Sequence, residues 1–128
     1  MTAISDDLET KLLNATLRNT SYTSPTTVYL ALFTTDPTDA DTGTEVTGGS
    51  YAREAVTFAA PSGGSTSNSG DITFTTATAS WGTITHAGIY DASSGGNLMY
   101  HGSLTASITI NSSDTAKFLT GDIVVSLD

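Results

Sequence analysis

Two histidines, His86 and His101, are the side chains of this sequence best suited to acid–base chemistry. They fall on two alternating stretches joined by the turn-rich residues 91–97, so a hairpin could bring them opposite each other. Asp91 or Asp114 could then orient one ring, as the aspartate of a hydrolytic triad does. The alternative is a packed or interface histidine pair, because serine and threonine form about a third of the chain and place hydroxyls near any histidine by chance.

Residues 34–49 form an acidic stretch that could supply oxygen ligands to calcium. The stretch lacks the glycine and terminal glutamate positions of helix–loop–helix calcium sites, which favours a solvated loop over a metal site. The sequence also has no Gly-x-Ser-x-Gly elbow, no His-Glu-x-x-His, no phosphate-binding glycine loop and no cysteine. We therefore expect no catalytic residue, no metal and no cofactor, and we do not expect an enzyme. The acidic residues of the stretch are Asp36, Asp39, Asp41 and Glu45.

Length and charge limit the remaining classes of protein. At 128 residues the chain fits a single domain, and a domain of that size buries roughly two-thirds of its unfolded surface. No run of ~18 apolar residues and no signal-peptide pattern occurs, which predicts a soluble, unprocessed protein that does not enter a membrane. Thirteen acidic residues against four basic ones give a net charge of −9, which disfavours binding to nucleic acid or to an anionic membrane.

The N-terminal segment is the one place where the sequence favours a helix. Ser5 is suited to cap it, and Asp6 and Asp7 follow at the positive end of the helix dipole. An apolar stripe runs along the segment, and it suits either a helix packed on its own domain or an arm that docks on a partner protein. We assign residues 1–20 to this helix or arm. Its candidate partner-binding residues are Ile4, Leu8 and Leu12, and the stripe is extended by Leu13 and Leu17.

Residues 21–128 carry the pattern of a single β domain. A central hairpin is expected with strands at residues 83–90 and 98–104, because side chains in strands alternate and the segment between them favours a turn. Residues 28–33 are apolar on both faces, which indicates a central strand. The series of short segments predicts an all-β fold, an antiparallel β-sandwich or small barrel of about seven or eight strands with one N-terminal amphipathic helix.

Weaker patterns complete the expected domain. Trp81, the only tryptophan, should be largely buried. The apolar parity changes between Phe74 and Trp81, which indicates a bulge or bend in a strand. Residues 60–70 are rich in glycine and serine and indicate a flexible loop. Further strands are expected at residues 51–58, 106–110, 116–118 and 123–127.

Arg53 is a fourth candidate for partner binding. It is one of only four cations in the chain, and arginine is favoured where a charge must be held at an interface. Two interpretations stay open for it, a salt bridge to a local carboxylate and an ion pair between subunits.

Four blocks of the sequence, taken in order, resemble a family of small virion proteins of tailed bacteriophages. They cover nearly the whole chain, and GGSYAR and SWGTITHAGIYDA are the most specific motifs. Members of this family are tail-fibre-like or other phage structural proteins, and some similar small β-proteins are capsid decoration, or cement, proteins. The resemblance carries over no catalytic or binding residue. The blocks are TSPTTVYLALFTTDPT, GTEVTGGSYAREAVTFAAPSGG, TATASWGTITHAGIYDASSGGNLMYHGSL and GDIVVSLD.

The resemblance implies a role in the virion, on the capsid surface or in the tail, with assembly in the cytoplasm of the bacterial host. One such role is a decoration protein, a trimer or dimer that binds the major capsid protein and bridges capsomers. The alternative is a tail or tail-fibre component, either a structural adaptor or a receptor-binding module, with other tail proteins as partners. The sequence lacks the repeats of an extended shaft, which favours capsid decoration.

Overall fold

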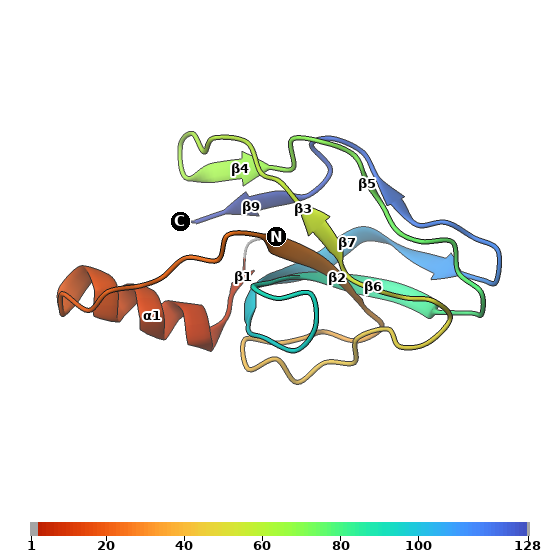
Figure 1. Ribbon diagram of the computed structural model, residues 1–128, viewed down its shortest axis with the longest axis horizontal. Helices are drawn as coiled ribbons and strands as arrows, with labels where there is room; N and C mark the ends of the chain where they lie inside the picture. Colours follow the sequence, from red (N-terminus) through yellow and green to blue (C-terminus); the bar gives the residue numbers. More distant parts are fainter. Residues whose placement is uncertain (1–2, 128) are drawn as a thin grey trace.

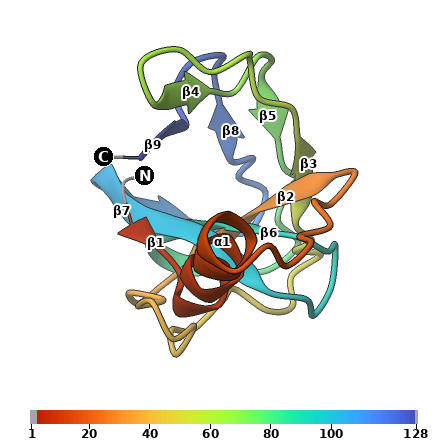
Figure 2. The same cartoon turned by 90° about the vertical axis from the view of Figure 1, so that its left-hand side faces the viewer.

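The computed structural model describes residues 3–127, which fold into two layers of antiparallel strands with one helix beside them (Figure 1). A five-stranded sheet in the order β1-β7-β6-β2-β3 is the first layer. Two small sheets, β4-β9 and β5-β8, lie over one of its faces and form the second (Figure 2). This arrangement confirms the predicted all-β, sandwich-like fold. The strands are β1 (Ala3–Ile4), β2 (Val28–Phe33), β3 (Glu54–Val56), β4 (Ser65–Ser67), β5 (Ile72–Thr73), β6 (Gly82–Tyr90), β7 (Leu98–Ile110), β8 (Lys117–Phe118) and β9 (Val124–Ser126).

The hairpin of β6 and β7 forms the centre of the main sheet, as the alternating sequence predicted. β6 is the middle strand, and β2 pairs with its other edge. The ladder between β6 and β7 is interrupted twice. Residue 99 is left over between the pairs Ile89–Tyr100 and Tyr90–Leu98, and residues 104–107 of β7 have only Thr85 opposite them. The strand expected at residues 106–110 is therefore not separate. It is the last part of β7, which begins within the bulge at residues 104–107 and pairs again from Ile108.

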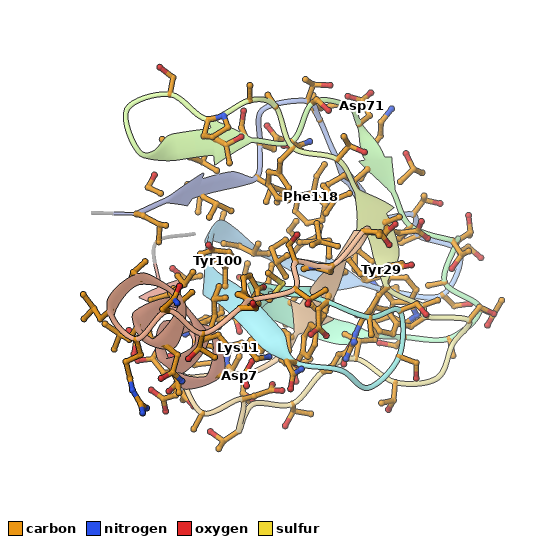
Figure 3. The ribbon with its side chains drawn as sticks, turned by 60° about the vertical axis from the view of Figure 1, so that its left-hand side comes forward. Asp7, Lys11, Tyr29, Asp71, Tyr100 and Phe118 are labelled. Atoms are coloured by element: carbon orange, nitrogen blue, oxygen red, sulfur yellow. The ribbon has the colours of Figure 1, made fainter. Side chains whose placement is uncertain are left out.

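The core between the two layers is built around aromatic rings. Trp81 is buried, as predicted, and its Nε1 donates a hydrogen bond of 2.9 Å to the carbonyl oxygen of Gly49. The rings of Tyr51 and Phe74 pack against it with centroid distances of 5.3 and 6.2 Å. Phe118 of β8 points between the layers and meets Phe74 (Figure 3). Gly49 has a φ of 56°, and a Cβ there would stand 2.9 Å from Trp81 Nε1, so the site requires glycine.

Two expectations about local structure were wrong. β4 lies inside residues 60–70, where we expected a flexible loop, and its serine and threonine residues pair with β9 in a contact that the local sequence does not reveal. Residues 74–81 are irregular rather than a bulged strand. The N–H of Phe74, for example, bonds to the carbonyl oxygen of Ala116 outside any strand.

The helix α1 (Asp6–Leu17) begins where the sequence predicted. The hydroxyl of Ser5 accepts a hydrogen bond from the N–H of Leu8 at 3.2 Å and donates one to the carbonyl oxygen of Leu98 at 2.5 Å, so the cap also ties the helix to β7. Past its first turns α1 extends beyond the end of the sheet (Figure 1). The division into residues 1–20 and 21–128 stays a prediction, and β1 joins the first described residues to the main sheet through β7.

The face of the main sheet that points away from the small sheets has its own apolar cluster. It consists of Ala31, Phe33, Tyr90 and Leu98. Residues 34–45, which we call the acidic loop, fold against this face, and α1 starts beside it (Figure 2). Both histidines and the aspartates of the acidic loop lie on this face.

Candidate functional site

Both histidines are held by aspartates of the acidic loop. His101 is buried, and its Nε2 lies 2.7 Å from Oδ1 of Asp39 and its Nδ1 3.8 Å from Oδ1 of Asp36. His86 Nε2 lies 4.0 Å from the other oxygen of Asp36. The two imidazoles therefore share one carboxylate, and the cluster joins β6, β7 and the loop.

This cluster differs from the triad that the sequence allowed. His86 pairs with Ser103 and His101 with Gly88, so the rings share a face of the sheet without standing directly opposite each other. Asp91 accepts hydrogen bonds from Asn97, and Asp114 accepts one from the backbone of residue 111, so neither orients an imidazole. That possibility was wrong, because the aspartates that do reach the rings come from the acidic loop.

The hydroxyl nearest to a histidine belongs to Thr85. Its Oγ1 lies 2.8 Å from Nδ1 of His86 and donates to the carbonyl oxygen of Thr34 at 3.1 Å. A nucleophilic hydroxyl would have to give its proton to the imidazole, whereas the Thr85 hydroxyl gives its proton to a carbonyl oxygen. Within residues 3–127 there is also no group of three or more histidine, cysteine or acidic side chains placed to hold a metal ion.

The acidic loop is a folded cover rather than a freely solvated segment. Its ends meet where the N–H of Thr34 bonds to the carbonyl oxygen of Thr44. The hydroxyl of Tyr90 donates to Oδ1 of Asp41 at 2.6 Å, and burial, with the neighbouring Asp41, raises the pKa of Tyr90. Gly43 closes the loop so tightly that a Cβ there would lie 2.6 Å from the backbone of Asp36. The loop thus binds the sheet through its carboxylates.

Arg53 makes the local ion pair that was one of its two interpretations. Its Nε and Nη2 donate to the two carboxylate oxygens of Glu45 at 2.8 and 2.9 Å. Its Nη1 donates to the carbonyl oxygens of Ala92 and Gly95 in the β6–β7 turn, and its guanidinium stacks over the ring of Tyr90 at 3.6 Å. The side chain is almost enclosed, so Arg53 acts as a clamp that joins β3, the acidic loop and the hairpin turn.

The other candidate partner-binding residues occupy different environments. Ile4 is half-buried in β1 and pairs with Tyr100 of β7. Leu8 is 3% exposed and packs within its own chain, whereas Leu12 is half-buried. The exposed apolar side chains of α1 are Leu13 and Leu17, 57% and 77% accessible. The apolar part of the exposed helix surface is therefore formed by the two leucines that the sequence only placed at the end of its stripe.

A second exposed surface is a cleft at the open side of the sandwich. Its volume is about 490 Å³, and it lies between the bulged part of β7 and the strands β8 and β9. Leu104 and Ile108 contribute apolar side chains from β7, and Phe118 and Ile123 lie at its base. No sequence pattern pointed to this cleft, because it depends on how the bulge separates the layers.

The fold and these surfaces define a small all-β protein with a helix that extends from its body. None of the helical structure in the described range is long and apolar enough to cross a membrane. Residues 3–126 match a family model described as Podophage GP4 fiber I protein gp80, and the chain belongs to this family. It is thus a bacteriophage virion structural protein of a tail-fibre-like family, which confirms the family resemblance seen in the sequence. No curated protein matches the chain.

Proposed function

We propose that the protein is a tail-fibre component that acts as a compact structural adaptor between virion proteins. The observation that carries this proposal is the match to a fibre protein model over residues 3–126. The geometry supports it, because the body presents two exposed leucines of its helix and a partly apolar cleft to other proteins. This function reverses the preference for capsid decoration that the missing shaft repeats suggested.

Capsid decoration is the second candidate, because the described residues form one compact body without an extended shaft. A decoration protein binds only the assembled shell and so stabilises it by mass action. A tail component does not contribute to shell stability in this way. The two functions therefore predict different defects in particles that lack the protein.

The test is to produce particles without the protein and to measure adsorption to host cells and heat-induced release of DNA. We expect poor adsorption or missing fibres, with DNA released at the same temperature as from complete particles. Restoring the full-length protein in trans should restore adsorption. Normal adsorption with DNA release at a lower temperature would overturn the fibre function in favour of decoration.

A further inference from the structure

The outer surface of α1 is not covered by any other part of residues 3–127. Leu13 and Leu17 lie one turn apart on this surface and are more than half exposed. The helix contacts the body through its N-terminal end, where Ser5 bonds to β7 and Leu8 is buried. Figure 2 looks along α1 and shows its far end in front of the sheet.

Apart from Lys11, which pairs with Asp7 at 2.7 Å, the charges of α1 and its cap lie at its two ends. Asp6, Asp7 and Glu9 stand in the first turn, and Arg18 caps the last one. Of the four cations, Arg18 is the one with no carboxylate within ion-pair distance in residues 3–127. Its guanidinium donates instead to the amide oxygen of Asn14 at 3.3 Å. Glu9 is exposed and likewise has no side-chain partner among the described residues.

We propose that this surface of α1 pairs with the same surface of a second copy of the chain, with the two helices antiparallel. In that orientation Leu13 and Leu17 of one copy pack against those of the other. Arg18 of each copy then lies beside the acidic first turn of its partner, and both contacts form twice because the pair has two-fold symmetry. The pairing is independent of where the protein sits in the virion.

Charge complementarity selects this partner and this orientation. Each chain carries a net charge of −9, so two copies repel each other across most of their surfaces. The stretch from Leu12 to Leu17 carries no charged side chain, and Arg18 follows it directly. A parallel arrangement would bring the two acidic first turns together, whereas the antiparallel one places opposite charges and opposite helix dipoles side by side.

The apolar part of the contact and the charged part have separate tests. The purified full-length protein is measured by sedimentation equilibrium over a range of concentrations, with Trp81 fluorescence as the check of folding. We expect a reversible dimer. Leu13→Ser combined with Leu17→Ser should weaken it by about a hundredfold, because four exposed leucines leave the interface. Leu119→Ser removes a comparably exposed leucine from another part of the surface and should leave the dimer unchanged.

A charge exchange distinguishes self-pairing from any other association. Arg18→Glu or Glu9→Arg alone should weaken the dimer by about tenfold, because each creates two like-charge contacts per dimer. The double variant, with both substitutions, should recover most of the affinity of the original chain. A protein that stays monomeric at all concentrations, or a double variant no better than the single ones, would overturn the proposal.

Discussion

The two faces of the main sheet are covered in different ways. The face toward the small sheets is closed by aromatic and aliphatic side chains around Trp81. The opposite face has a small apolar cluster, and its cover is held by polar contacts from Asp36, Asp39, Asp41 and Arg53. Burial of apolar area therefore dominates the first side, and hydrogen bonds and ion pairs dominate the second.

This difference separates two kinds of stability. An apolar core depends on volume and shape, and a lost side chain leaves a cavity. A polar cover depends on the pairing of each group, since removal of one partner leaves the other desolvated without its bond. Substitutions on the two sides should therefore change the free energy of unfolding by different amounts and with a different dependence on pH.

The largest effect is expected on the aromatic side. Trp81→Ala removes a buried indole and the hydrogen bond to Gly49, and it should lower the free energy of unfolding by about 3–5 kcal/mol. Urea denaturation followed by circular dichroism measures this loss. A decrease below about 1 kcal/mol would show that the core does not depend on Trp81 and would contradict the difference drawn between the two sides of the sheet.

The Arg53 clamp should give the largest effect on the polar side. Arg53→Ala leaves the partly buried Glu45 without its bidentate partner and frees the turn carbonyls, so we expect a loss of about 2–3 kcal/mol. Lys117→Ala is the matched control, because Lys117 forms an exposed ion pair with Asp71 at 3.6 Å. That variant should differ from the original chain by less than about 0.5 kcal/mol. If Arg53→Ala and Lys117→Ala lowered stability equally in thermal denaturation, the assignment of Arg53 as a clamp would be contradicted.

Tyr90→Phe should lower the stability by less than Arg53→Ala does, and it tests one contact of the polar side alone. It removes only the hydrogen bond from the hydroxyl to Asp41 while the ring stays under Arg53, so the expected loss at neutral pH is about 1 kcal/mol. Urea denaturation of this variant beside Arg53→Ala separates the loop contact from the clamp. A loss as large as that of Arg53→Ala would mean that the two groups act as one unit.

Tyr90 should also make the stability of the protein depend on pH in the alkaline range. Burial raises the pKa of Tyr90, and the neighbouring Asp41 adds to this rise. The unfolded state therefore loses its phenolic proton first, and the stability present below the unfolded pKa, about 10, is lost as pH rises toward the folded value. Unfolding free energies measured between about pH 8 and about pH 11 should fall less steeply for Tyr90→Phe than for the original chain. Identical slopes would show that Tyr90 does not contribute to the alkaline loss.

Local patterns in the sequence predicted the elements that local physics determines. The alternation around Ile84 and the turn-forming residues 91–97 predicted the β6–β7 hairpin, and Ser5 predicted the start of α1. Trp81 was predicted to be buried from its residue type alone. Each of these inferences depends on a preference that acts within a few residues of the chain.

The contacts of the candidate site could not be predicted in the same way. Asp36 and Asp39 lie about 50 residues or more before the histidines they hold, and nothing in their spacing identifies the sheet face on which they settle. The apolar residues of α1 are spread around the helix, so the sequence could not show that Leu8 is buried while Leu13 and Leu17 are exposed. The polar strand β4 was missed because serine and threonine also suit a loop.

The number of copies in each virion tests the central claim, a fibre component, most directly. Quantitative mass spectrometry of purified particles gives this number relative to the major capsid protein. A tail-fibre component should be present in a few to a few dozen copies, because a tailed particle has one tail. Hundreds of copies per particle would place the protein on the capsid lattice and contradict the proposed function.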